Sequence, residues 1–424
     1  MKNLLKRIIL DFHNRPLPPF KKRHTDVPPD IEKIITIIGP RRAGKTYYLF
    51  QIMDKLEKQG IERKRILYLN LEDERIELNG NYDLIIESYL ELYPDIDIAK
   101  SYLFFDEIQE LHDWEKFIRR LQDTHTKHIF LTGSNSKLLS KEIATSLRGR
   151  SISFEIFPLS FSEFLDFKGI DSKDTYSTRN ASVIGNAFED YLLWGGYPEL
   201  TGMDSHLKVQ VMQEYFNVMI YRDLTERYDI RDVSILKYLI KRLISSFTKE
   251  FSVNKLYNDL KSRGLSISKN HIYKTVEQIF SVYMLANVEK YDPSVIKREM
   301  SNKKVFLYDN GLVSAASYSP FEDRGKLMEN LVFSHLRRST EDIFFMKNGW
   351  ECDFLTFQKG NKPLLIQVTN HLNQDNYRRE IKGLENARKK IPDAETLLIS
   401  EQIDKNLAVP EWIRTSRITD WLLA

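Results

Sequence analysis

Residues 34–46, IITIIGPRRAGKT, join a short β-branched run to a loop bounded by two glycines. The run Ile34–Ile38 has no polar alternation, which is typical of a strand covered on both faces in a parallel sheet. The loop has the spacing G-x-x-x-x-G-K-[ST] and precedes a helical pattern, the order that a phosphate-binding loop requires. It consists of Gly39, Pro40, Arg41, Arg42, Ala43, Gly44, Lys45 and Thr46.

This loop predicts a site for ATP with Mg²⁺. Its backbone N–H groups are expected to turn inward around the phosphates, and the glycines allow that close approach. Lys45 would neutralise charge on the β- and γ-phosphates, and the Thr46 hydroxyl would bind Mg²⁺.

A second apolar run, Leu103-Phe104-Phe105, ends in the acids Asp106 and Glu107. In a parallel sheet such a strand delivers both acids to the carboxyl edge, beside the phosphate loop. Asp106 is expected to hold Mg²⁺ through its water shell. Glu107 would orient and deprotonate the attacking water, which predicts ATP hydrolysis as well as binding.

Two further groups of polar residues follow in the sequence. Ser134 and Asn135 come after the next strand and are candidates for contact with the γ-phosphate or the water; turn formation is the alternative. Arg148 and Arg150 precede the last core strand. Either could stabilise transition-state charge on a neighbouring subunit's nucleotide, or both could be a surface pair on a loop.

The order of strands and helices predicts an α/β fold with a doubly wound parallel sheet in residues 31–160. The strand at Leu67–Leu71 could occupy the sheet edge. The whole chain has 424 residues, enough for two to four domains, and its 63 basic and 60 acidic residues leave a net charge of +3. This balance neither demands nor excludes nucleic acid.

The composition also bears on the compartment. Cys352 is the single cysteine, so no intrachain disulfide can form, which fits a reducing compartment. No apolar run approaches the roughly 20 residues that span a bilayer. A cytoplasmic protein without membrane contact is therefore expected. Residues 1–30 are basic and rich in proline, and predict a solvated extension or, alternatively, an arm that contacts a polyanion.

The C-terminal half contains the pattern of a helix-turn-helix. Ser252–Lys261 and Ser268–Phe280 are predicted helices, with Ser268 as the cap of the second. The stretch Val288–Leu307 could form a wing that carries Lys297, Arg298, Lys303 and Lys304. A winged helix predicts contact with DNA; packing between domains is the alternative.

Taken in order, the motifs GPRRAGKT, LFFDEIQ, LTGSNSKLL, SLRGR, FPLSFSEFL, LWGGYPE, KVFLYDNGL and ECDF resemble a bacterial and archaeal family of AAA+ ATPases. Members join a P-loop ATPase core to a winged helix and a C-terminal nuclease-like domain. The resemblance implies an N-terminal extension (1–30), an ATPase core (31–160), a helical lid (161–245), a winged helix (246–312) and a nuclease-like domain (313–424).

The last domain resembles the PD-(D/E)xK nuclease fold. Glu329 and Asp353 correspond to acids that bind metal in active members, and predict a weak second metal site. Gln367 and Thr369 stand where the second acid and the lysine would be, so a degenerate domain is expected. Glu351 is an alternative acid on the same strand face as Asp353.

These patterns predict a Mg²⁺-dependent ATPase that couples turnover to its C-terminal domains. DNA is the expected partner of the winged helix and the C-terminal domain, and the arginine pair predicts a homo-oligomer. One alternative is a nucleotide-gated switch that binds a protein partner. The other is an ATP-regulated, metal-dependent nuclease.

Overall fold

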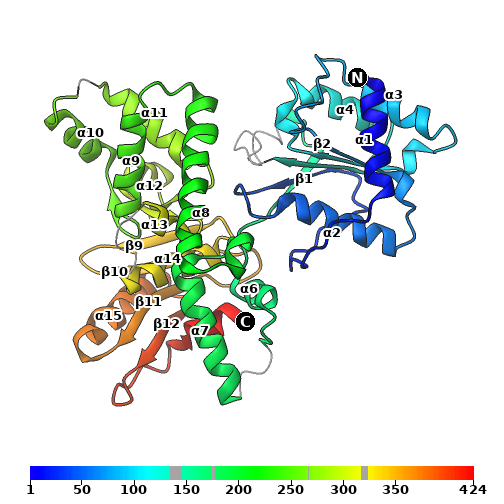
Figure 1. Cartoon of the computed structure of the whole chain (residues 1–424). Coiled ribbons are helices and arrows are strands. Elements are labelled where there is room, and N and C mark those ends of the chain that lie inside the picture. The colour runs from blue at the N-terminus through cyan, green and yellow to red at the C-terminus, as the bar shows by residue number, and fades with distance from the viewer. Residues whose placement is uncertain (134–145, 173–176, 266, 317–322) are drawn as a thin grey trace. The chain divides into compact units, whose positions relative to one another are not determined.

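The computed structural model describes residues 1–133, 146–172, 177–265, 267–316 and 323–424. The chain divides into two compact units, Met1–Phe157 and Pro158–Ala424, which we call the N-terminal and the C-terminal unit. Each unit has a sheet of its own (Figure 1). In the part of the chain that is described, every helix is too short or too polar to cross a membrane.

The sheet of the N-terminal unit is parallel throughout. Its described strands are β1 (Ile34–Ile38), β2 (Ile66–Asn70), β3 (Tyr102–Asp106), β4 (Ile129–Gly133) and β5 (Ser151–Glu155). Their spatial order is β2-β3-β4-β1-β5, and each pairing is parallel. The predicted α/β class with a P-loop sheet is confirmed, and β2 lies at the sheet edge beside β3.

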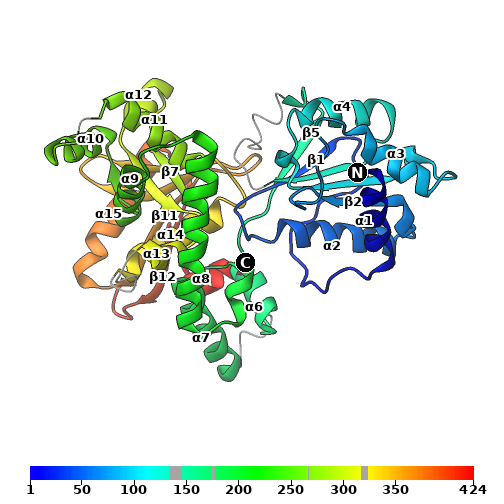
Figure 2. The same ribbon diagram turned by 45° about the horizontal axis from the view of Figure 1, so that its top comes forward.

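Helices cover both faces of this sheet, as the unbroken apolar strands require. They are α1 (Lys2–Asn14), α2 (Lys45–Lys58), α3 (Asp83–Leu92) and α4 (Trp114–Thr124). The side chains of β1 alternate between the two faces of the sheet, so they pack in two separate cores. Ile35 and Ile37 pack with α2, whereas Ile34 and Ile38 pack in a separate core with α1, α3 and α4. Figure 2 shows α2 on one side of the strands and α4 on the other.

The first 30 residues differ from the solvated extension that was expected. Helix α1 buries Leu5 and Ile9 completely in the core on its side of the sheet. Residues 15–30, which we call the strap, pass along α2 and bury Val27 in the opposite core. The apolar positions of α1 follow a helical spacing, so its burial has a simple physical cause in one amphipathic face.

The C-terminal unit contains a longer, mixed sheet. Its order within the described residues is β13-β12-β11-β10-β9-β7-β8-β6. The strands are β6 (Glu250–Phe251), β7 (Leu285–Lys290), β8 (Lys303–Leu307), β9 (Ile343–Lys347), β10 (Glu351–Thr356), β11 (Leu364–Leu372), β12 (Glu395–Ile403) and β13 (Arg414–Arg417).

Its helices pack on this sheet and on one another. They are α6 (Phe161–Lys168), α7 (Thr178–Trp194), α8 (Ser205–Val218), α9 (Val233–Ser245), α10 (Val253–Ser262), α11 (Lys269–Phe280), α12 (Val295–Met300), α13 (Gly311–Ala316), α14 (Arg324–Leu336), α15 (Gln374–Lys390) and α16 (Ile418–Leu423). A π-helical segment, Met219–Glu226, continues α8.

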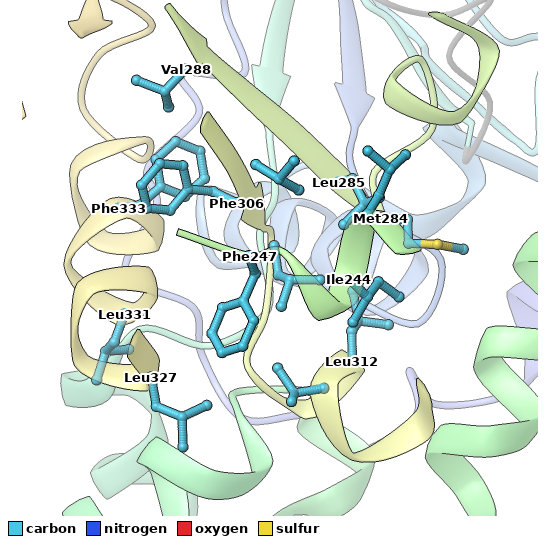
Figure 3. Packing of buried hydrophobic residues seen from close by; sticks show 14 of the residues in the cluster. Ile244, Phe247, Met284, Leu285, Val288, Phe306, Leu312, Leu327, Leu331 and Phe333 are labelled. Carbon is cyan, nitrogen blue, oxygen red and sulfur yellow. The ribbon is translucent and has the colours of Figure 1, made fainter. Parts of the chain in front are cut away.

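One hydrophobic core runs through the regions predicted as lid, winged helix and nuclease-like domain. Strand β7 pairs in parallel with β9, so the hairpin β7–β8 belongs to the same sheet as β10–β13. Figure 3 shows side chains of this core, where Ile244 of α9, Phe306 of β8 and Phe333 of α14 pack in one cluster. The division of this half into three domains stays a prediction.

Candidate functional site

The loop between β1 and α2 has the backbone conformation of a tight phosphate-binding turn. Gly44 is the N-cap of α2 with φ +94°, and Arg42 also has a positive φ of 62°. Gly39 has φ +145°, and a Cβ there would lie 2.1 Å from the carbonyl oxygen of Ile156. Such a contact is impossible, so only glycine fits where the loop leaves β1.

Lys45 is folded back over this loop. Its ammonium donates hydrogen bonds to the carbonyl oxygens of Gly39, at 3.2 Å, and Pro40, at 2.9 Å. The side chain is buried although it lies at the start of a helix. The loop therefore encloses a positive charge at a helix N-terminus, a place that favours an anion.

Asp106 lies at the carboxyl end of β3 and is almost completely buried. Thr132 of β4 donates a hydrogen bond to its Oδ1, and the Tyr68 hydroxyl of β2 donates one to Oδ2 at 3.1 Å. Thr46 of the loop also hydrogen-bonds this carboxylate. Burial raises the pKa of Asp106, the charge of Glu107 adds to the rise, and the three hydroxyls oppose it. The structure thus brings together the predicted Thr46 and Asp106.

Glu107 follows in a left-handed backbone conformation, φ 53°, which is uncommon for a residue with a side chain. Its backbone N–H donates to Thr132 Oγ1 at 2.9 Å, and its Oε2 accepts from Gln109 Nε2 at 2.5 Å. Its side chain is half-buried. The acid next to Asp106 is therefore held at the same edge of the sheet.

Two residues of this arrangement were missed by the sequence analysis. Thr132 is the residue before the end of β4, and one hydroxyl serves both acids by donating to Asp106 and accepting from Glu107 N–H. The polar position in an apolar strand was a usable signal. Tyr68 had no signal in the sequence, because its contact with Asp106 depends on β2 lying beside β3 in the sheet. Ser134 and Asn135 lie outside the described residues.

Arg148 and Arg150 lie at the amino ends of the strands, whereas the loop lies at their carboxyl ends. The carbonyl of Arg150 accepts from Ile34 N–H at the start of β1, whereas the loop follows the end of β1. Five strand residues separate the two ends by roughly 17 Å. Arg148 is exposed, and Arg150 pairs with Asp123 of α4 at 2.7 Å. Neither arginine is brought to the P-loop of its own chain.

The residues at the carboxyl edge fit Mg²⁺ bound together with a nucleotide. Within the described ranges, no three His, Cys, Asp or Glu side chains gather in a group that could hold a metal alone. Asp106 and Thr46 supply one carboxylate and one hydroxyl. Mg²⁺ is commonly bound by one or two protein oxygens, with phosphates and water as its other ligands.

Comparison with known proteins finds two matching families and several similar proteins. The AAA domain family matches residues 31–165, and a domain of unknown function (DUF8612) matches residues 185–322. The uncharacterized protein MJ1544 of Methanocaldococcus jannaschii is 40% identical over 363 residues, which cover 84% of this chain and 79% of that protein. An uncharacterized protein of Haemophilus influenzae is 31% identical over 340 residues, covering 80% and 83%.

The chain belongs to the family of these two uncharacterized relatives, and its residues 31–165 match the AAA domain. Among solved structures, Orc1 of Aeropyrum pernix in complex with DNA matches with a TM-score of 0.31 and 13% identity, over 76% of this chain and 93% of that one. Cdc6p of Pyrobaculum aerophilum matches with a TM-score of 0.24 and 12% identity, over 70% and 87%. Both scores are too low to imply a shared function.

In this AAA-family protein the predicted second metal site contains a lysine. Lys304 of β8 is buried, and its ammonium lies 2.9 Å from Glu329 Oε1 and 2.7 Å from Glu351 Oε1. Burial opposes the charge of Lys304, but Glu329, Asp353 and Glu351 together raise its pKa above the ordinary value. An ammonium among these acids leaves them a poor fit for a divalent cation.

The remaining nuclease-like positions are also engaged within the unit. Asp353 Oδ2 accepts the backbone N–H of Val368 at 2.8 Å, and burial raises the Asp353 pKa well above its ordinary range. Gln367 donates to the buried carboxylate of Glu380 on α15 at 2.6 Å. Glu380 was not found by the sequence analysis, because it reaches Gln367 from another element.

Proposed function

We propose that this AAA-family protein binds ATP with Mg²⁺ on its P-loop and hydrolyses it. The observation that carries the proposal is the buried Asp106 carboxylate, which Thr46, Thr132 and Tyr68 hold at the carboxyl edge of the sheet. A buried carboxylate beside a P-loop threonine suits a metal ion that is bound together with phosphate. The positive charge of the metal compensates the negative charge of the carboxylate, which is costly to bury alone.

The loop residues bind and orient the nucleotide. Backbone N–H groups of the loop and the N-terminus of α2 face the phosphates, and the Lys45 ammonium exchanges its carbonyl partners for phosphate oxygens. Thr46 and Asp106 would hold the metal ion, which would supply positive charge against the phosphate groups. Thr132 and Tyr68 fix the Asp106 carboxylate in one orientation.

Glu107 is the proposed general base. Its half-buried carboxylate, next in the chain to the metal acid, takes a proton from the water that attacks the γ-phosphorus. The hydrogen bond from Gln109 limits the positions that this carboxylate adopts. Water thus adds to phosphorus, ADP leaves, and the proton passes to Glu107.

The test is steady-state ATP hydrolysis by wild type, Glu107→Gln and Lys45→Ala. Wild type turns over; Glu107→Gln keeps ATP binding and loses at least about 100-fold in kcat; Lys45→Ala loses binding. Glu110→Gln, an exposed acid three residues farther on, is the matched control. Turnover by Glu107→Gln equal to that of the control contradicts the assignment of the base.

A second proposed activity is contact with DNA through α11. Ser268 caps this helix by accepting His271 N–H at 3.2 Å, as the sequence predicted. Its exposed side chains are polar or basic at the N-terminal end: Lys269, Asn270, His271, Tyr273 and Lys274. Basic and amide groups at a helix N-terminus are suited to phosphates and base edges.

The predicted wing supports DNA contact less than α11 does. Lys304 is buried among acids, and Lys303 pairs with Glu289 at 2.8 Å. The experiment is duplex binding across a salt series by Lys269→Gln/Lys274→Gln, with Lys100→Gln/Lys116→Gln, two exposed lysines of the N-terminal unit, as the charge-matched control. The double variant of α11 lowers the slope of log binding constant against log salt concentration by about two, and the control leaves this slope unchanged.

Two further measurements, ATP hydrolysis with and without DNA and plasmid cleavage, would select the alternatives. ATP binding with negligible turnover and no effect of DNA favours a nucleotide-gated switch with a protein partner. Plasmid cleavage with Mn²⁺ that disappears in Asp353→Ala favours an ATP-regulated nuclease.

A further inference from the structure

Arg23 of the strap is a buried charge that joins two distant parts of the N-terminal unit. Its side chain is 7% exposed. Nη1 donates to the carbonyl of Ala43 at 2.8 Å, and Nη2 donates to the carbonyl of Phe157 at 2.7 Å. Gln51 of α2 fixes the backbone of Arg23 by accepting its N–H at 2.7 Å and donating to its carbonyl at 3.1 Å.

The first of these carbonyls lies inside the P-loop. Ala43 stands between Arg42 and Gly44, which both have positive φ. In a trans peptide the C=O and the next N–H point in opposite directions. Because Arg23 holds the Ala43 carbonyl, the N–H of Gly44 is turned away from Arg23.

The second carbonyl belongs to the last residue of the N-terminal unit. The segment before it already touches the loop: Ile156 N–H donates to Ile38 at 2.8 Å, and Gly39 is packed against the Ile156 carbonyl. Arg23 adds a connection from the other end of the loop. The chain therefore leaves the unit through a segment fixed to both ends of the P-loop.

The next residues are fixed just as firmly inside the C-terminal unit. Arg338 donates to the carbonyl of Pro158. Leu159 donates its N–H to the Gly196 carbonyl at 2.6 Å and accepts the Tyr191 hydroxyl at 2.8 Å. Two consecutive carbonyls, on either side of the junction between the units, are thus each held by an arginine from their own unit.

We propose that Arg23 is a positioning residue for the nucleotide site and links the shape of the P-loop to the junction at 157–158. The proposal rests on the proposed ATP site. A change of loop shape on nucleotide binding moves the Ala43 carbonyl, and the planar guanidinium transmits this movement to Phe157. Lysine has one ammonium on a flexible stem and cannot reproduce this paired geometry.

The experiment uses the full chain with Arg23→Gln, Arg23→Lys and the control Lys22→Gln, whose side chain is exposed. ATP affinity is measured by equilibrium titration. Nucleotide-dependent amide hydrogen exchange is measured in peptides covering residues 159–168. Thermal unfolding without nucleotide reports whether each variant is folded.

Wild type and Lys22→Gln bind ATP and change exchange in 159–168 when they do so. Arg23→Gln binds about tenfold more weakly, and the exchange response is lost. If Arg23→Gln does not fold, Arg23→Lys decides: a weakened exchange response in a folded protein supports the proposal. Wild-type affinity and response in Arg23→Lys, or in folded Arg23→Gln, overturn it. Absence of ATP binding by wild type overturns the ATP site as well, so the two failures are distinguishable.

Discussion

The ammonium of Lys304 lies 2.9 Å from the carboxylate of Glu329, in the interior of the C-terminal unit. The lysine comes from β8 and the acid from α14, so the pair joins the predicted winged helix to the predicted nuclease-like domain. Glu351 and Asp353 of β10 complete the negative surroundings. A resident cation thus stands among the acids that would otherwise attract a metal.

Lys304→Met is expected to destabilise the C-terminal unit by about 3–5 kcal/mol, because it leaves buried carboxylates without their counter-charge. Urea unfolding measures the loss. Lys303→Met is the matched control: its partly exposed pair with Glu289 should contribute under about 1 kcal/mol.

The variant Lys304→Met also tests whether the lysine takes the place of a metal ion. Mn²⁺ should restore part of the stability of Lys304→Met and leave nucleotide-free wild type unchanged. Equal stabilisation of both proteins by Mn²⁺ would show that the lysine does not displace a metal.

Thr132→Val removes the hydroxyl that holds Asp106 and accepts the N–H of Glu107. We expect kcat for ATP to fall about tenfold or more while ATP affinity changes by less than about threefold. Thr132→Ser keeps the hydroxyl and should restore turnover. Thr124→Val, on the exposed surface of α4, is the control. Equal loss in the serine and valine variants would indicate a packing effect.

Arg148 and Arg150 lie at the amino ends of the strands, opposite the P-loop. If either stabilises charge on the phosphates, it must therefore act on the nucleotide of a neighbouring subunit. Arg148→Ala or Arg150→Ala should reduce kcat by up to about 10³-fold with ATP affinity retained. Mixing the affected variant with Glu107→Gln should restore about a quarter of the wild-type rate, because some mixed interfaces contain both intact groups.

The readout is ATP hydrolysis at fixed total protein, together with the mass of the assembly in solution. A protein that hydrolyses ATP efficiently as a monomer, or a mixture no more active than its parts, argues against the action of either arginine on a neighbouring subunit's nucleotide.

Asp309 gives a pH prediction. Burial raises its pKa to about 6 from 3.8, although the N–H groups of Gly196 and Gly311 oppose the shift. Between these values the folded protein holds a proton that the unfolded chain has lost. Stability from this group is therefore present at low pH and declines by roughly 3 kcal/mol as pH rises from 4 to 6.

Asparagine does not titrate, so the destabilisation caused by Asp309→Asn should be larger at pH 4.5 than at pH 7. Unfolding free energies of both proteins at the two pH values measure this difference. A destabilisation that grows with pH would mean that the charged carboxylate is the favoured form in the folded protein.

The sequence by itself determined the parallel α/β sheet of the N-terminal unit, though not the packing of residues 1–30, and the two halves of its candidate site. Local patterns suffice there: the unbroken apolar strands require a sheet covered on both faces, and the motif spacing places Lys45 and Thr46 at a helix N-terminus. Parallel strands bring their carboxyl ends to one edge, so the meeting of Thr46 with Asp106 also followed from the sequence.

The tertiary structure alone decided which polar groups hold that site in place. Tyr68 reaches Asp106 across 38 positions of the sequence, and Arg23 reaches Ala43 and Phe157 across 20 and 134. Lys304 was expected on a wing and is buried among acids. A buried polar group must find its partner wherever packing brings one, and strand order and long-range packing between segments leave no local pattern in the sequence.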